Sequence, residues 1–213
     1  MNTKKNLLCS IIIRTKNEEK WINRCLNKIA EQTYKNFEII IVDNFSEDST
    51  INIVQKYKKK IDIKITYLKN YLPGLALNKG IRKSKGDYIC MLSAHCIPKN
   101  KNWLKYLVNA IEEKKNIAGV YGRQEPMNFT SNDDKRDLFT VFGLDKKIQI
   151  KDSFFHNANS IIKKSCWNEV NFDEKLTNIE DRLWAQEILK KNYILIYDPK
   201  PSVFHYHGIH QSK

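Results

Sequence analysis

The chain has 213 residues, of which 41% are hydrophobic and 29% are charged, enough to bury a core in one large domain or two small ones. No apolar run approaches the roughly 20 residues of a membrane-spanning helix, and the polar start at residues 1–6 predicts a cytoplasmic protein without a secretion signal. The net charge of +13 suits a phosphate, nucleic-acid or anionic membrane partner, and equally a solvated basic surface.

Five cysteines form no C-x-x-C pair, and their number is odd. Cys9 and Cys90 lie inside apolar, strand-like runs. The sequence therefore predicts reduced thiols in the core of a cytosolic protein.

Strand and helix patterns alternate at short intervals in the first half, which predicts an α/β domain with a mostly parallel central sheet. Buried strands are expected at 7–13, 37–42 and 87–92, with a more exposed strand at 61–68. The apolar stripe from Trp21 to Ala30 predicts the first helix, and Ser46 is expected to cap the second, which carries Ile51, Val54 and Tyr57. A short helix is expected at 75–83.

The second half is less regular. A helix is expected at 101–115 and a strand at 117–121, whereas residues 123–157 have no clear period and read as a long loop of functional or mobile character. A strand at 160–162, a helix at 180–191 and two strands at 193–197 and 202–206 follow. With no linker or repeat in between, a single domain is predicted over residues 1–213.

Polar residues follow each strand of the first half: Arg14 to Glu18 after the first, Asp43 to Ser46 after the second, and Ser93-Ala94-His95 after the fourth. Ligands of open parallel sheets bind at these carboxyl ends. Neither a P-loop nor a G-x-G-x-x-G is present, which argues against a P-loop enzyme or a typical dinucleotide oxidoreductase.

Several ordered motifs together resemble the family 2 glycosyltransferases of the GT-A fold, inverting enzymes that move a sugar from a nucleotide diphosphate to an acceptor. The motifs are the segments 10–18, Gln32-Thr33-Tyr34 before 37–43, 46–50, Gly74 with Asn78-Lys79-Gly80, 86–89, and Glu180-Asp181 with Trp184. The resemblance implies one GT-A domain with helices on both faces of the sheet, a nucleotide-sugar half at 1–98 and an acceptor and catalytic half at 99–213.

The resemblance also implies donor-binding roles. Asp43 is similar to an aspartate that accepts a hydrogen bond from the base, and Thr15 and Glu18 would line the base and ribose pocket; an ionised carboxylate suits an imide N–H because it only accepts. The alternative is that Asp43 and Ser46 merely form a turn and a helix cap. The expected donor-binding set is Thr15, Asn17, Glu18, Asp43, Asn44, Ser46, Asn78, Lys79, Ser93, Ala94 and His95.

Glu180 and Asp181 are the expected catalytic pair. In the family the aspartate of this pair removes the proton of the acceptor hydroxyl, which requires a carboxylate with a pKa lifted toward neutrality. Two acids in the first turn of a helix are also what the helix dipole favours, so their position alone does not separate a base from a cap.

The family's usual Asp-x-Asp, which holds a divalent cation, is replaced here by Ser93-Ala94-His95. A Mn²⁺ or Mg²⁺ cofactor is therefore doubtful, because these ions prefer carboxylate oxygens. His95 can bind a metal through its imidazole, it can donate to the diphosphate without metal, or the site is inactive. His205 and His207, at alternate positions of an expected strand, can join His95 as metal ligands or a phosphate clamp, or can be surface residues.

Leu77 stands where many relatives carry an arginine near the diphosphate, so one cation is missing there. Lys79, Arg82 and Arg123 could share the phosphate charge. Arg123, Asn157 and Trp184 are the expected acceptor-binding residues, and they do not identify the acceptor.

The leading hypothesis is an inverting transfer, most simply from a UDP-sugar, to a bacterial surface polysaccharide or lipid-linked glycan, by a cytoplasmic enzyme in peripheral contact with the anionic inner membrane face. The alternative is a non-catalytic relative that binds nucleotide or glycan as an assembly subunit. No nucleic-acid partner is expected, because the aromatic residues fall on core stripes.

Overall fold

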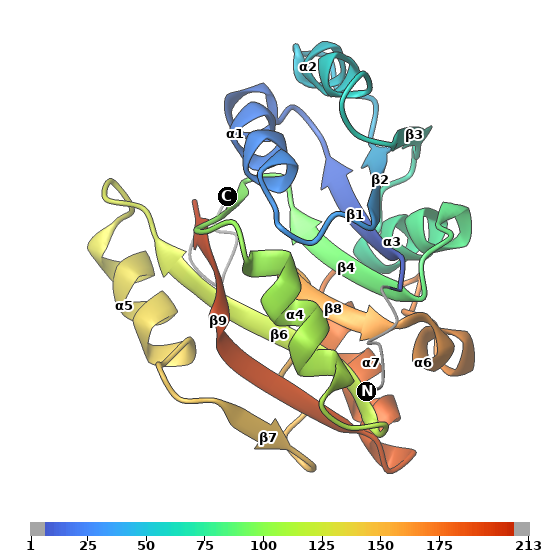
Figure 1. Cartoon of the computed structure of the whole chain (residues 1–213), viewed down its shortest axis with the longest axis vertical. Coiled ribbons are helices and arrows are strands. Elements are labelled where there is room, and N and C mark those ends of the chain that lie inside the picture. Colours follow the sequence, from blue (N-terminus) through green and yellow to red (C-terminus); the bar gives the residue numbers. More distant parts are fainter. Residues whose placement is uncertain (1–6, 207–213) are drawn as a thin grey trace.

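The computed structural model describes residues 7–206 as one nine-stranded sheet flanked by helices (Figure 1). The strands are β1 (Cys9–Thr15), β2 (Phe37–Asp43), β3 (Ile63–Tyr67), β4 (Tyr88–Ser93), β5 (Cys96–Pro98), β6 (Ile117–Pro126), β7 (Lys147–Gln149), β8 (Asn159–Lys163) and β9 (Ile194–His205). The helices are α1 (Glu19–Ala30), α2 (Thr50–Tyr57), α3 (Pro73–Lys83), α4 (Trp103–Glu112), α5 (Asn132–Val141), α6 (Lys164–Glu169) and α7 (Glu180–Lys190). The predicted α/β fold is confirmed.

The strand order is β3-β2-β1-β4-β8-β6-β9-β5, with β7 paired to β9. The first four strands run parallel, and each of β1, β2 and β4 is an almost continuous apolar run, as expected for strands buried on both faces. In the other half, β6 and β9 run parallel, and β5, β7 and β8 pair antiparallel to their neighbours.

Alternate residues of each strand enter two separate cores, one on each face of the sheet. Ile11 and Ile13 of β1 pack with α1, α2 and α4, whereas Ile12 packs with α3, α5, α6 and α7. The helices therefore cover both faces, as the sequence predicts (Figure 1).

Three sequence-based expectations are wrong in detail, and two short elements were missed. The interval 123–157 is not one long loop, because it holds the end of β6, then α5 and β7. The two expected C-terminal strands are one strand, β9, which continues through 198–201 with register shifts in its pairing to β6. The short elements β5 and α6 were not predicted. Ser46 does not cap α2, which begins at Thr50; its hydroxyl bonds to Asp43 instead.

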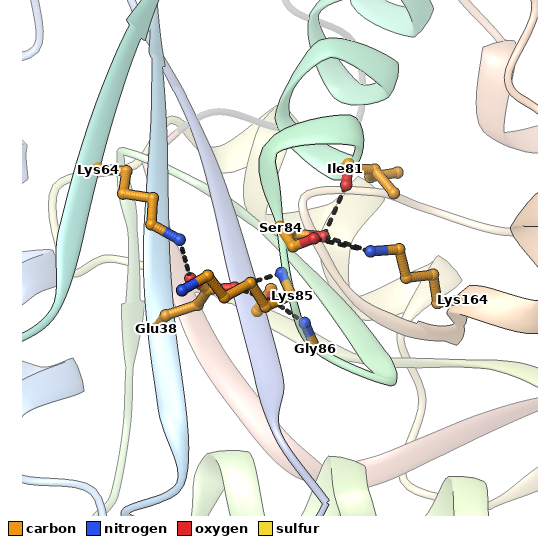
Figure 2. A network of polar contacts seen from close by, with 8 residues as sticks. Glu38, Lys64, Ile81, Ser84, Lys85, Gly86 and Lys164 are labelled. Carbon is orange, nitrogen blue, oxygen red and sulfur yellow. Dashed lines mark hydrogen bonds and ion pairs between the residues drawn. The ribbon is translucent and has the colours of Figure 1, made fainter.

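At the amino ends of the parallel strands, the buried carboxylate of Glu38 ties four segments together (Figure 2). It accepts from Lys64 of β3 at 2.6 Å, from the Lys85 amide at 2.6 Å and from the Ser10 hydroxyl at 2.7 Å. The Ser10 hydroxyl in turn accepts from the Gly86 amide at 2.8 Å. This Glu38 network joins β1, β2 and β3 to the turn before β4, at the edge opposite the carboxyl ends.

All five cysteines are buried and free, as predicted. Across residues 7–206, no helix combines the length and the apolar character needed to cross a bilayer.

Candidate active site

The carboxyl ends of β1, β2 and β4 lie side by side and bring the polar segments of the first half together. In the strand register Thr15 is opposite Asp43, and Arg14 is opposite Ser93. Residues far apart in sequence therefore meet at one edge of the sheet, where ligands of such sheets bind.

The Asp43 carboxylate organises the loop after β2. It accepts from the Thr15 hydroxyl at 2.7 Å, from the Ser46 hydroxyl at 2.6 Å and from the Ser46 amide at 2.8 Å. Asp43 is fully buried, and its hydrogen bonds to Thr15 and Ser46 shape the loop.

Asn17 and Asn44 lie on either side of that loop. Asn17 has a left-handed backbone, with φ of 55°, and its side-chain oxygen accepts from the Glu47 amide at 2.9 Å. In the orientation that satisfies both side-chain atoms of Asn44, its nitrogen donates to the Leu68 carbonyl at 2.8 Å and the Lys69 carbonyl at 3.1 Å. Asn44 is partly exposed, so its polar atoms are open to a ligand, whereas those of the buried Asp43 are not.

Glu18, His95 and His205 form a second group. Nδ1 of His95 lies 2.9 Å from the Glu18 carboxylate, and the rings of His95 and His205 stack with their centroids 5.2 Å apart and 13° between their planes. A carboxylate only accepts, so Nδ1 of His95 carries a proton and the ring is oriented by Glu18. His207, the third predicted histidine, lies outside the described residues.

The residues at this point do not by themselves form a site for Mn²⁺ or Mg²⁺. Two imidazoles and the Ser93 hydroxyl lack the carboxylate oxygens that hard cations prefer, although a carboxylate behind a histidine is common around metals. Within residues 7–206 no three His, Cys, Asp or Glu side chains are grouped so that they could hold a metal ion.

A cavity of about 490 Å³ opens at this edge of the sheet. The predicted residues Ser93, Asn157, Glu180, Asp181 and His205 line it. The predicted catalytic pair and Ser93, which is 87 residues before Glu180 in the sequence, therefore line the same cavity.

Asp181 is held at the wall of the cavity by the backbone. Its carboxylate accepts from the Asn157 amide at 3.1 Å and from the Arg182 amide at 2.8 Å. Burial raises the pKa of Asp181, against the opposing effect of these two hydrogen bonds and of Arg14 and Arg182. A raised pKa is what a carboxylate needs to accept a proton from a hydroxyl.

Glu180 is buried and points its carboxylate at Arg14 of β1, with 3.5 Å between Oε1 and the guanidinium. The Asn157 side chain also donates to Glu180, at 3.4 Å. Burial lowers the pKa of Arg14, but Tyr71, Glu180 and Asp181 raise it by more, so the guanidinium stays charged. Glu180 therefore anchors α7 to the sheet.

The residue just before this helix has a strained backbone. Ile179 has φ of 55°, a left-handed conformation that a β-branched side chain adopts at a cost of about 1–3 kcal/mol. Its side chain lines the cavity and is 52% exposed. Such strain is typical of functional sites.

Four of the predicted site residues belong neither to the cavity nor to the two polar groups after β1, β2 and β4. Asn78 is buried and holds the segment 167–174, accepting from the Trp167 indole at 2.8 Å. Lys79 donates to the Tyr67 carbonyl at 2.5 Å. Trp184 is in the core and donates to the Val170 carbonyl at 2.9 Å, and the Arg123 guanidinium lies 3.7 Å from Glu125. None of the four lines the cavity.

Nine of the residues that line the cavity were not among the predicted site residues, and Arg14, Tyr71 and His156 are three of them. Arg14 directly follows a buried strand, so its position in the sequence could have identified it. Tyr71 and His156 lie in irregular segments that no periodic pattern places.

The chain has clear relatives. Residues 10–170 match the family described as Glycosyl transferase family 2. The poly(ribitol-phosphate) beta-N-acetylglucosaminyltransferase TarS of Staphylococcus aureus is 28% identical over 202 residues, which cover 90% of this chain and 34% of TarS. The chain thus spans about a third of that relative.

Solved structures of low sequence identity share the fold. The structure of S. aureus TarS residues 1–349 with UDP-GlcNAc superposes with a TM-score of 0.77 at 21% identity, covering 97% of this chain and 60% of that one. The mannosyltransferase PcManGT from Pyrobaculum calidifontis, in complex with GDP-Man and Mn²⁺, superposes with a TM-score of 0.76 at 19% identity, covering 92% and 56%.

Proposed function

Because the chain belongs to glycosyltransferase family 2, we propose that it transfers a sugar, with inversion, from a UDP-sugar to a hydroxyl of a bacterial surface polysaccharide or lipid-linked glycan. The observation that carries the proposal is the raised pKa of Asp181 in a cavity that also contains Ser93 and His205. The similarity of the fold to a UDP-GlcNAc complex of TarS supports the choice of donor.

In the proposed reaction Asp181 takes the proton of the acceptor hydroxyl. The acceptor oxygen forms a bond to the anomeric carbon while the bond from that carbon to the diphosphate breaks, and the nucleoside diphosphate leaves. Glu180 keeps Arg14 charged and holds α7, so Asp181 stays within the cavity.

The donor half of the site is proposed at Thr15, Asn17, Asn44 and Ser46, with Asp43 behind them. Polar oxygens and amides on the loop after β2 suit a base and ribose, and the buried Asp43 carboxylate fixes the loop in advance. Because these donor residues lie in the first half and Asp181 lies in the second, residues 1–98 are proposed as the donor half and residues 99–213 as the acceptor half.

His95, His205 and Ser93 are proposed to face the diphosphate. A divalent ion bound there would neutralise the leaving group. Because Ser93, His95 and His205 carry no carboxylate of their own, we assign the contact with the phosphate oxygens to the imidazoles, and Glu18 orients the His95 ring.

Purified protein incubated with a panel of UDP-, GDP- and dTDP-sugars tests the proposal. We expect slow hydrolysis of at least one UDP-sugar in wild type, and in Asp181→Asn retained nucleotide binding with hydrolysis lowered by about 10²- to 10⁴-fold. Absence of binding and of hydrolysis across the panel would contradict the proposal.

The replaced Asp-x-Asp favours one alternative, a non-catalytic relative that binds nucleotide or glycan as an assembly subunit. Cells that carry Asp181→Ala separate the two. Unchanged glycan synthesis would support the assembly subunit, and loss of synthesis with normal protein levels would support the enzyme.

The net charge of +13 supports a further part of the proposal, a location at the anionic inner face of the plasma membrane. We expect the protein to sediment with vesicles of anionic phospholipid at low salt and to be released at high salt. Equal sedimentation with zwitterionic vesicles would contradict an electrostatic contact.

A further inference from the structure

His156 is a cavity residue that the proposed reaction does not yet use. It lies just before β8, and its ring packs beside two phenylalanines that contact each other, with its centroid 5.9 Å from that of Phe142 and 6.4 Å from that of Phe154. The next residue, Asn157, donates to both Asp181 and Glu180. His156 thus lies beside the proposed base and in the same cavity.

The hydrogen bonds of His156 select one tautomer. Its Nδ1 lies 3.3 Å from the Ala158 amide nitrogen and 3.0 Å from the Gln124 side-chain nitrogen. A backbone amide can only donate, so Nδ1 must be the acceptor. In the neutral ring the proton is then on Nε2.

The surroundings also keep the ring neutral. Burial against the two phenylalanines lowers the pKa of His156 to about 4; Glu180 raises it, whereas Arg182 and Arg14 lower it further. At neutral pH the ring therefore offers an N–H without a positive charge. A charged ring there would lower the pKa of Asp181 and weaken it as a base.

The orientation of the Gln124 side chain leaves one buried polar atom without a partner among the described residues. Its side chain is fully buried in β6, and its Oε1 has no hydrogen-bond partner among the described residues. A buried unpaired carbonyl costs about 1–3 kcal/mol, and such groups call for an explanation. Turning the amide would place its oxygen against the unprotonated Nδ1, so the N–H that Gln124 gives to His156 accounts for the orientation.

We propose that His156 donates its Nε2–H to a hydroxyl oxygen of a sugar or polyol acceptor, next to the hydroxyl that Asp181 deprotonates. No protein group competes for this proton, because none of the described residues accepts a hydrogen bond from Nε2. The proposal rests on the proposed glycosyl transfer and adds the residue that orients the acceptor.

Two other roles for His156 do not fit the geometry. A metal ligand needs a ring nitrogen with a free lone pair, but Nδ1 accepts two hydrogen bonds and Nε2 carries the proton. A general base needs a pKa near the working pH, and that of His156 is about 4.

Nuclear magnetic resonance on protein with ¹⁵N-labelled histidine tests the tautomer. We expect one histidine, missing from the spectrum of His156→Phe, to be neutral and protonated on Nε2 at every pH from 6 to 8. A His156 that titrates in this range, or that carries its proton on Nδ1, would overturn the proposal.

Glycerol as acceptor probe tests the contact. In the hydrolysis assay with a UDP-sugar, glycerol competes with water, and the ratio of glyceryl glycoside to free sugar reports acceptor binding independently of the overall rate. We expect His156→Phe to lower this ratio about three- to tenfold, the equivalent of one neutral hydrogen bond, and His156→Gln, whose amide nitrogen can replace Nε2, to keep most of it.

If His156 had a purely structural role, His156→Gln would lower the ratio of glyceryl glycoside to free sugar more than His156→Phe does. Phenylalanine packs against Phe142 and Phe154 better than glutamine does, so a ratio preserved in His156→Phe and lost in His156→Gln would overturn the proposal. Thermal unfolding of both variants shows whether they fold. If wild type consumes no UDP-sugar, both the proposed function and the acceptor role of His156 fail. If wild type reacts normally but His156→Phe keeps the ratio and His156→Gln loses it, only the proposal for His156 fails.

Discussion

At Asp181, burial and two backbone hydrogen bonds act in opposite directions on one carboxyl group. Burial favours the neutral acid and wins, so the pKa is raised. The environment that makes the carboxylate a better base therefore also lowers the stability of the folded protein at neutral pH, where the carboxylate is ionised.

The Asp181→Asn substitution should separate these two effects. Activity should fall by about 10²- to 10⁴-fold, the range of a lost general base. Because the folded pKa lies above the ordinary value of 3.8, the variant should be at least as stable as wild type at pH 7, and its advantage should shrink as the pH falls to 3.8. Urea unfolding at pH 7, 5 and 4 measures this; a less stable variant at pH 7 would contradict it.

The stacked pair of His95 and His205 should act as a unit. We expect His95→Ala and His205→Ala each to lower UDP-sugar hydrolysis at least tenfold (about 1.4 kcal/mol), and the double variant to be little worse than either one. Losses that multiply would show independent contributions. Repeating the assays with EDTA and with added Mn²⁺ tells whether the imidazoles act directly or through an ion.

At the scale of elements, α7 carries the proposed base and is fixed by its first residue. Glu180 reaches across to Arg14 of β1, and both side chains are largely buried, at 7% and 19% exposure. The strained Ile179 immediately before it sets the angle at which the chain enters the helix. A helix start held this way keeps Asp181 in place even without a side-chain cap.

Glu180→Gln should therefore cost stability as well as activity. Removing one partner of a largely buried pair should lower the free energy of unfolding by about 1–3 kcal/mol. Glu187→Gln is the matched control, because it breaks the exposed pair with Lys190 in the same helix and should cost less than about 0.5 kcal/mol. Urea unfolding decides; equal effects of the two substitutions would contradict the anchoring role.

The elements that were predictable are those with a strong apolar period. β1, β2 and β4 are doubly buried runs, and α1 and α4 carry five or more buried side chains each. In contrast, α5 buries only Leu138, and β5 and β7 have three residues each, too few for any period. Their positions are set by tertiary contacts with β6 and β9, which a pattern along the chain does not contain.

Part of the site was predictable because some of its residues lie at the ends of regularly patterned elements. Asp181 and Ser93 stand at the ends of regular elements, and the family resemblance pointed to them. The inward side of Trp184 follows from the helical spacing of 180–191, and its burial is confirmed. The places of His156 and Tyr71 depend on how irregular segments fold against the sheet, so sequence spacing could not predict them.

Across the whole molecule, polar groups are concentrated at both edges of the parallel sheet, for different purposes. The cavity lies at the carboxyl ends, and the Glu38 network lies at the amino ends (Figure 2). Although burial acts to raise it, the pKa of Glu38 is lowered by Lys64, by the Lys85 amide and by Ser10. Its ionised form therefore stabilises the fold.

Glu38→Gln should weaken the fold and spare the site. We expect a loss of about 1–3 kcal/mol at pH 7, as for a buried hydrogen-bonded charge pair. Because the folded pKa is lowered, the difference from wild type should narrow as the pH falls below the ordinary value of 4.5. Urea unfolding measures it, with Glu31→Gln, which breaks the exposed pair with Lys28, as control. Unchanged stability at pH 7 would contradict the network's role.

The backbone amide of Asn157 should respond to the ionisation of Asp181. Its hydrogen points at the Asp181 carboxylate, so its electronic surroundings change when that carboxylate gains or loses a proton. In an amide spectrum recorded across pH, the Asn157 resonance should move with the midpoint of Asp181. The Asn157 amide thus reports the ionisation of the proposed base without any substrate or chemical reaction.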